Sequence, residues 1–436
     1  MRKIKLILAF SAVFILLSGK AYSQFLMDMV DTTKSEGRGI LGVYKKFDRL
    51  KIGGYIQPQF QIATGTSAKS YEGGDFGPEI NNRFMLRRSR IRIDYVSRGE
   101  NKDPGLQIVF QFDANERGFT VRDVWGRIFE NRFKLFSFTI GMFARPFGYE
   151  INYSSSDRES PERGRMSQIL MKGERDMGAM VSFDPRRNIP VLNKFKIDVG
   201  LFNGQGINTT RDFDNYKDLI ARVSLKPIAL SKNVSFTLGA STLQGGLLQG
   251  TKYEYYTGLA NGINTTLVDS SATNLYSKSP RKYYGADAQL KIRNRIGFSE
   301  FRAEYITGKQ TATNSSSESP IALMTGKDGY NVRNFRGGYL YYVQSLFSAK
   351  HQLVVKYDWY DPNSEVKGSD IGVTGSKLTD ADIQYNTLGF GYINYLTENI
   401  KLVFYYAKVM NESTLLKGYT SDVKDDVMTF RIQYRF

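Results

Sequence analysis

The sequence predicts an all-β fold, a transmembrane antiparallel β-barrel of about 16 strands with short periplasmic turns and long extracellular loops. Three observations support this prediction: an N-terminal secretory signal, apolar side chains at every second position, and connections that alternate between short and long. The composition is polar, with 24% charged residues. Such a chain still suits a bilayer when only one face of each strand contacts lipid.

Residues 1–23 have the three-part layout of a secretory signal peptide. Basic residues near the start are followed by an apolar run over 6–17, and Ala21 and Ser23 then precede a cleavage point. The apolar run is too short to cross a bilayer as a helix, which takes roughly 20 residues. The alternative is a buried N-terminal helix of a soluble domain.

The mature chain then divides into an N-terminal periplasmic segment, residues 24–48, and a barrel domain, residues 49–436. The sequence has no Cys, which excludes disulfides, thiolate metal sites and a lipid anchor on an N-terminal Cys. The N-terminal segment is too short for the plug domain of an active transporter, whose barrel needs about 22 strands. No motif predicts a cofactor, and none is expected.

Alternation with a period of two dominates from residue 49 onward. Ile108, Phe110 and Phe112, for example, alternate with polar residues, whereas a helix would repeat its apolar positions every three or four residues. Most runs are near the ~9–11 residues that a tilted membrane strand needs. The predicted strands are 49–63, 83–96, 105–116, 119–130, 135–145, 177–184, 194–203, 218–226, 233–242, 282–292, 299–308, 334–343, 350–360, 384–394, 399–410 and 425–436.

The connections between these strands differ systematically in length. Short turns such as 130–134 and 396–399 alternate with long polar loops such as 146–176 and 243–281. This asymmetry is typical of outer-membrane barrels. The final strand ends on Phe436 and resembles the C-terminal strand through which outer-membrane proteins engage the barrel-assembly machinery. The predicted location is therefore the bacterial outer membrane, crossed many times.

The excess of positive charge indicates anionic partners. The formal net charge is +17. Nucleic-acid-binding proteins concentrate such charge in a patch or helix, but here it is spread singly along alternating strands, so no nucleic acid is expected. An Arg or Lys facing lipid costs ~2–4 kcal/mol at the midplane, which places the basic residues toward the pore. The predicted pore-lining basic residues are Arg88, Arg90, Arg92, Lys196, Arg222, Lys226, Lys291, Arg302, Lys356, Arg431 and Arg435.

Arg88, Arg90 and Arg92 are spaced two residues apart, which predicts three guanidiniums ~6.5–7 Å apart down one wall. A positively charged wall attracts anions, and guanidinium forks match phosphate and carboxylate geometry. Acidic residues such as Asp94 and Asp113 are also expected to face inward. They leave an alternative open, a salt-bridged wall without ion preference.

Several motifs resemble the phosphate-selective porin O/P family, in its Bacteroidetes-type form, and together cover nearly the whole mature chain. The resemblance implies a 16-stranded trimeric porin with a constricted, basic lumen. Phosphate selectivity in that family depends on an arginine ladder, which Arg88, Arg90 and Arg92 resemble in part, and on lysines of a constriction loop. The motifs are Gly53-Gly54-Tyr55-Ile56-Gln57-Pro58-Gln59-Phe60, Arg88-Ser89-Arg90-Ile91-Arg92, Ala144-Arg145-Pro146-Phe147-Gly148, Glu174-Arg175-Asp176-Met177-Gly178, Phe202-Asn203-Gly204 and Tyr357-Asp358-Trp359-Tyr360-Asp361-Pro362.

The same resemblance implies that the third external loop, 146–176, is the constriction loop that narrows the pore. Six acidic residues lie among its basic ones, so ion pairs within the loop are the expected arrangement. The predicted constriction residues are Arg158, Arg163, Arg165, Lys172 and Arg175.

These observations predict an outer-membrane porin for passive diffusion of small hydrophilic solutes, with a mild preference for anions such as phosphate, assembled as a homotrimer in outer-membrane lipid. The alternative is a surface adhesin or a structural barrel without significant conductance. No enzymatic activity is expected. A Ser–His pair needs a His, and the only one, His351, begins a strand beside a short turn.

Overall fold

The computed structural model describes residues 49–98, 103–209 and 211–436. The predicted signal peptide and the predicted N-terminal segment, 1–23 and 24–48, lie outside the described residues. Within the described part of the chain the only α-helix is α3 (Arg165–Leu170), and no helix there is long and apolar enough to cross a membrane. Short 3₁₀ turns occur at η2 (Leu192–Lys194), η3 (Ala272–Asn274), η4 (Gly368–Asp370) and η5 (Asp380–Asp382).

Strands make up most of the unit that spans Ile52–Phe436. Of the 19 described strands, β9 (Ile228–Ser231) adds a short pairing to β10, and β11 (Glu254–Ala260) and β12 (Ile263–Asp269) form a hairpin within a loop. The remaining 16 form the wall: β1 (Leu50–Ala63), β2 (Asn82–Arg98), β3 (Pro104–Asn115), β4 (Gly118–Phe129), β5 (Phe136–Ala144), β6 (Arg175–Phe183), β7 (Phe195–Phe202), β8 (Asp218–Leu225), β10 (Val234–Leu248), β13 (Lys278–Asn294), β14 (Gly297–Ala312), β15 (Tyr330–Ser345), β16 (His351–Asp361), β17 (Tyr385–Tyr395), β18 (Ile400–Asn411) and β19 (Val427–Arg435).

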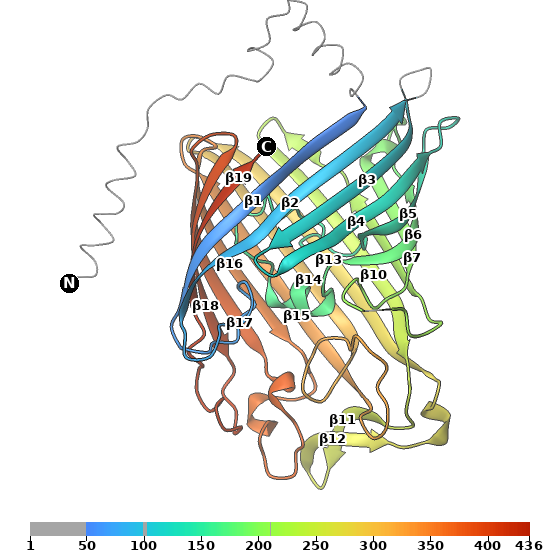
Figure 1. Ribbon diagram of the computed structural model, residues 1–436, viewed down its shortest axis with the longest axis vertical. Coiled ribbons are helices and arrows are strands. Elements are labelled where there is room, and N and C mark those ends of the chain that lie inside the picture. Colours follow the sequence, from blue (N-terminus) through green and yellow to red (C-terminus); the bar gives the residue numbers. More distant parts are fainter. Residues whose placement is uncertain (1–48, 99–102, 210) are drawn as a thin grey trace, which may run out of the picture. The chain divides into compact units, whose positions relative to one another are not determined.

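Antiparallel pairing of successive wall strands closes the sheet into a ring (Figure 1). The ring closes where β1 pairs with β19, in a register from Tyr55↔Arg435 to Ala63↔Val427. Beyond that ladder, Gly54 and Phe436 exchange both backbone hydrogen bonds, at 3.1 and 3.0 Å. Each wall strand therefore has a partner on both sides, which removes the exposed edges of an open sheet. The prediction of a closed 16-stranded antiparallel barrel is confirmed.

The two faces of the wall differ in chemistry, as the alternation requires. Outward side chains such as Ile91 and Phe138 are apolar and exposed in the isolated chain. Their neighbours in sequence, Arg90 and Thr139, face inward and are buried. An apolar outer face suits lipid and a polar inner face suits water. The protein is therefore a multi-pass transmembrane barrel of the bacterial outer-membrane type.

The structure departs from the sequence prediction at β10, which extends to Leu248 instead of ending at residue 242. The prediction took Gly245 as part of a loop, but this glycine pairs with Arg281 of β13. A Cβ at position 245 would lie 1.6 Å from Asp218 Oδ1. Glycine is therefore required here to leave room for the buried carboxylate, and it does not end the strand.

The sequence predicts only a long loop, 243–281, where the structure has the hairpin β11–β12. Its turn is Asn261-Gly262, and both residues have positive φ angles, 52° and 76°. Asn-Gly is the residue pair that two-residue hairpin turns favour, because both central positions need positive φ. The Asn-Gly pair therefore indicates this hairpin in the sequence itself.

Candidate solute pathway

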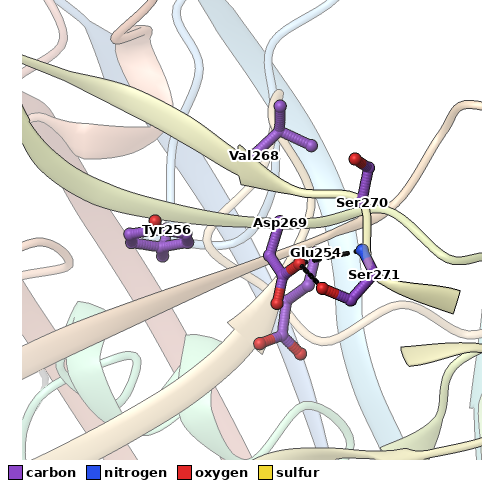
Figure 2. Close-up of a pocket in the computed structure, with 6 residues that line it drawn as sticks. All are labelled: Glu254, Tyr256, Val268, Asp269, Ser270 and Ser271. Atoms are coloured by element: carbon purple, nitrogen blue, oxygen red, sulfur yellow. Dashed lines mark hydrogen bonds between the residues drawn. The ribbon is translucent and has the colours of Figure 1, made fainter. Parts of the chain in front are cut away.

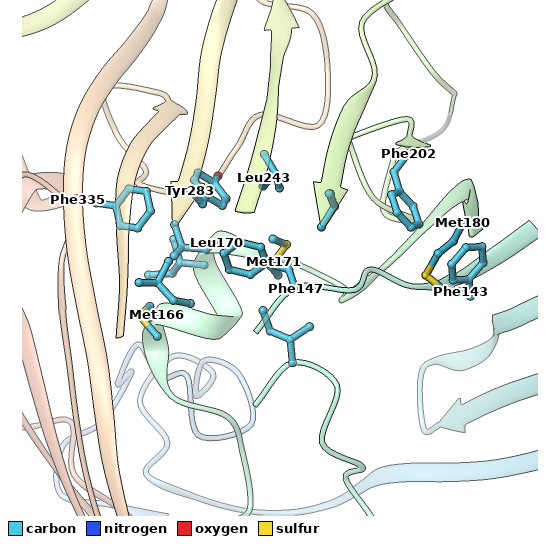
Figure 3. Packing of buried hydrophobic residues seen from close by; sticks show 14 of the residues in the cluster. Phe143, Phe147, Met166, Leu170, Met171, Met180, Phe202, Leu243, Tyr283 and Phe335 are labelled. Carbon is cyan, nitrogen blue, oxygen red and sulfur yellow. The ribbon is translucent and has the colours of Figure 1, made fainter. Parts of the chain in front are cut away.

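The loop between β5 and β6, residues 145–174 and called L3 from here on, folds into the barrel. One side of L3 is apolar: Phe147, Met166 and Leu170 are almost fully buried. They pack against inward side chains of the wall, including Tyr283 and Phe335 (Figure 3). Burying such side chains contributes on the order of 1.5–3 kcal/mol each, so the apolar contact holds L3 inside the lumen.

The start of L3 is tied to the wall by a carboxylate. Glu304 on β14 accepts hydrogen bonds from the backbone N–H groups of Tyr149 and Glu150, at 3.1 and 2.9 Å. Gly148 precedes them with φ of +65°, and a Cβ there would lie 2.2 Å from Glu304 Oε1. Glycine therefore permits both the left-handed backbone and the close approach of the carboxylate.

Glu162 in L3 is enclosed by three arginines of the wall. Arg87 donates from Nε and Nη2 at 2.8 and 2.9 Å, and Arg88 from Nη1 and Nη2 at 3.1 and 2.6 Å. Arg431 Nη2 adds a further bond at 2.9 Å. Burial alone would raise the pKa of this carboxyl, but Arg87, Arg88 and Arg431 outweigh it and hold the pKa well below its usual range. Three guanidiniums thus share one carboxylate.

All 11 predicted pore-lining cations form ion pairs, with N–O distances no longer than 4.0 Å. Five of them, Arg88, Arg90, Arg302, Lys356 and Arg431, are buried, whereas the side chains of Lys291 and Arg435 are about half exposed. Besides Arg88 and Arg431 with Glu162, the pairs are Arg90–Asp113, Arg92–Asp94, Lys196–Asp198, Arg222–Asp287, Lys226–Asp184, Lys291–Glu300, Arg302–Glu159, Lys356–Glu150 and Arg435–Asp157.

The predicted constriction residues have different partners. Arg158 is buried and donates to the backbone carbonyls of Ser160 and Pro161. Arg165 lies over the rings of Tyr71 and Tyr385, 4.7 and 3.5 Å from their centroids. Their companions form ion pairs: Arg163 with Glu174, Lys172 with Glu318 at 2.5 Å, and Arg175 with Asp123 and Glu174 at 3.1 and 3.2 Å.

The expectation that L3 neutralises its charges internally is wrong for most of its acids. Glu150, Asp157, Glu159 and Glu162 all pair with cations of the wall, and only Glu174 pairs within the predicted loop. The wall partners lie far away in sequence, up to 278 residues for the Arg435–Asp157 contact. Charge counting within a loop cannot detect such partners. Ion pairing therefore fastens L3 to the wall on several sides.

A second cluster at the end of L3 includes a residue that the sequence prediction missed. Arg122 on β4 pairs with Glu174, which also pairs with Arg163 and Arg175. Arg122 was missed because β4 contains a bulge: Gln111 pairs with Asp123, but the next residue, Phe112, pairs with Val121. A bulge shifts the alternation by one residue, so parity no longer tells which face a side chain occupies.

Two further inward cations, Arg127 and Lys401, were not among the predicted residues. Arg127 donates to Thr139 Oγ1 at 2.8 Å and lies 5.0 Å from the centre of the Trp125 ring. Lys401 is buried and donates to the backbone carbonyls of Ser156 and Arg158 in L3. The alternation of strand 119–130 gives Arg127 the same face as Asp123, whereas strand 399–410 is largely apolar on both faces, so alternation gives no signal for Lys401.

The single histidine has a tyrosine as its hydrogen-bond partner. His351 Nδ1 lies 2.7 Å from the Tyr392 hydroxyl, on the neighbouring strand β17. Within the described ranges, no group of three His, Asp or Glu residues is placed to hold a metal ion. That the protein is not an enzyme stays a prediction.

An open cavity of about 560 Å³ lies beside the hairpin β11–β12 (Figure 2). Its charged lining residues are Glu254 and Asp269, and no basic residue lines it. Asp269 Oδ1 accepts from the backbone N–H and the hydroxyl of Ser271, at 2.9 and 2.5 Å, and so closes its own turn. The chemistry of this cavity does not suit an anion.

Glu72, in the loop between β1 and β2, gives the lumen a pH-dependent contact. Burial, followed by the nearby Glu162 carboxylate, raises the pKa of Glu72 from 4.5 to about 8. Between pH 4.5 and about pH 8 the Glu72 carboxyl is protonated when the loop is docked and ionised when the loop is released. Docking of the loop therefore weakens as pH rises through this window. We expect single-channel conductance to increase as pH rises from about 4.5 to about 8, because the loop detaches over this range.

The variant Glu72→Gln isolates this effect, because the amide cannot ionise. Its conductance should be independent of pH over the same range. A wild-type conductance that does not change with pH, or a change that persists in Glu72→Gln, would contradict the assignment to Glu72.

Comparison with solved structures finds this architecture in other outer-membrane proteins. OprB of Pseudomonas putida matches at 9% identity over 93% of this chain and 98% of its own, with a TM-score of 0.56. OmpT of Vibrio cholerae in its trimer form matches at 10% identity over 89% and 99%, with a TM-score of 0.51. An anion-selective porin from Comamonas acidovorans matches at 11% identity over 89% and 99%, with a TM-score of 0.50.

These similarities establish that the chain has the barrel fold of outer-membrane porins. No family model matches the sequence, and no curated protein matches it. Membership of the phosphate-selective porin O/P family therefore stays a prediction from the motifs.

Proposed function

We propose that this protein is an outer-membrane porin through which small hydrophilic solutes diffuse passively, with a mild preference for anions such as phosphate. The observation that supports the anion preference is the excess of guanidiniums over carboxylates around L3. Arg87, Arg88 and Arg431 share Glu162, so that cluster keeps a positive charge despite its ion pairs. Positive charge focused between low-dielectric walls attracts anions.

The cluster around Glu174, at the end of L3, adds to the same positive field. Arg122, Arg163 and Arg175 pair with Glu174 and Asp123, which leaves one positive charge in excess. The preference is expected to be small, because every predicted pore-lining cation already has an acidic partner. The Comamonas acidovorans porin described as anion-selective has the same barrel fold, and this similarity of fold supports the proposal.

We further propose that the barrel forms a homotrimer in outer-membrane lipid and is inserted by the barrel-assembly machinery through β19. The trimeric form of the similar Vibrio barrel is consistent with this assembly. The proposal for β19 rests on its alternating sequence and its terminal aromatic residue, Phe436.

The test is a planar bilayer recording of the purified protein in a salt gradient. We expect stable open steps with a reversal potential displaced toward that of the anion, and Arg122→Gln should move it toward the non-selective value. The control Arg132→Gln removes a positive charge from an exposed turn and should leave it unchanged. A cation preference would contradict the anion part of the proposal. Absence of conductance would favour the alternative of an adhesin or structural barrel.

A further inference from the structure

A second cavity, of about 370 Å³, lies on the side of L3 that faces the short turns. Its lining contains four acidic and four basic side chains, so its formal charges cancel. Most of them neutralise each other in place: Arg302 pairs with Glu159 and Glu300, and Arg435 pairs with Asp157. Unlike the arginine clusters around Glu162 and Glu174, this cavity offers an anion no excess charge.

Three tyrosines give the same cavity flat apolar surfaces. Tyr149 and Tyr153 of L3 stack with ring centroids 5.5 Å apart and an interplanar angle of 19°. Tyr395, at the end of β17, contributes the third ring. All three are half-buried, so part of each ring remains accessible. Aromatic faces beside polar groups are typical of sites that bind small organic molecules.

The two glutamines of the lining differ in how far their hydrogen bonds are satisfied. Gln433 donates from Nε2 to the carbonyl of Ser156 at 3.1 Å, and its Oε1 accepts from Gln57 at 2.7 Å. Gln352 also lines the cavity, and its Oε1 is buried without a hydrogen-bond partner among the described residues. An enclosed acceptor without a partner is costly, so this amide is suited to a donor from a bound solute.

We propose that this cavity is a binding subsite for a neutral, hydroxyl-rich solute of the sugar type, an inference that rests on the proposed porin function. A hydroxyl both donates and accepts, which matches a lining of paired charges and amides. The C–H face of a sugar ring is apolar and packs against an aromatic ring. The volume also falls within the ~300–1,000 Å³ of sites for small ligands.

Titration calorimetry of the full-length protein in detergent micelles, with glucose as the probe, tests this proposal without requiring a current. Wild type should bind glucose saturably. Tyr395→Leu removes an aromatic face and should weaken binding by roughly 2- to 10-fold, whereas Tyr395→Phe keeps the face and should bind like wild type. The matched control Tyr256→Leu changes an exposed tyrosine of the hairpin β11–β12 and should bind like wild type.

Three outcomes would overturn the subsite: no saturable binding of glucose, unchanged binding in Tyr395→Leu, or displacement of glucose by inorganic phosphate. Bilayer recordings of the same preparation separate this failure from that of the proposed function. Protein that binds glucose without conducting would support the subsite and refute the porin. Protein that conducts but shows no glucose binding would refute the subsite alone.

Discussion

Glu162→Gln is expected to lower the stability of the barrel and to increase its preference for anions several-fold. Glu162 receives five hydrogen bonds from Arg87, Arg88 and Arg431. Breaking a buried ion pair by removing one partner typically costs about 3–5 kcal/mol, because the remaining charges stay buried and uncompensated. The substitution also raises the excess positive charge of this cluster, which strengthens the attraction of anions.

Urea unfolding in micelles measures the first effect, and the reversal potential in a salt gradient measures the second. Glu318→Gln is the matched control, since it removes the same charge from the more exposed pair with Lys172. Exposed ion pairs contribute about 0–1 kcal/mol, so both readouts should stay close to wild type. Equal effects of Glu162→Gln and Glu318→Gln would contradict the view that Glu162 compensates the buried arginines.

Leu340→Arg is expected to destabilise the membrane-inserted barrel by ~2–4 kcal/mol, the cost of placing Arg on the lipid face near the bilayer midplane. Leu340 lies near the middle of β15, and 57% of its surface is exposed in the isolated chain. Its neighbours across the sheet are Ala303 and Tyr357, which offer no countercharge.

Folding into lipid vesicles across a urea series measures this cost. Leu415→Arg is the matched control, because Leu415 is similarly exposed at 62% but lies in the loop between β18 and β19. That variant should fold like wild type. A Leu340→Arg barrel as stable as wild type would mean that this face does not contact lipid.

The wall could be predicted from the sequence because alternation is a local signal. It placed Arg88 and Arg90 on the inner face and Ile91 on the outer face without knowledge of any partner strand. It failed where tertiary contacts override the local pattern. The bulge of β4 changed the parity at Arg122, and the glycine at 245 made room for Asp218 of a neighbouring strand.

The interior could be predicted only in outline. The sequence identified Arg88, Arg431 and the third external loop, which meet at Glu162, but it did not identify Arg87 as a third partner. It could not identify Arg431 as a partner of Glu162, because the two residues are 269 positions apart and meet only once the ring has closed. The neutral cavity was missed for the same reason, since L3, β14 and the turn between β17 and β18 form it jointly.

The closure between β1 and β19 also has a kinetic consequence. The backbone bonds between Gly54 and Phe436 join residues separated by almost the whole barrel domain. Contacts of such high contact order form late, after the entropy of a very long loop has been lost. Until then both terminal strands have unpaired edges, which are templates for aggregation. The barrel is therefore most prone to aggregation before β1 and β19 have paired, and closure of the ring removes this risk.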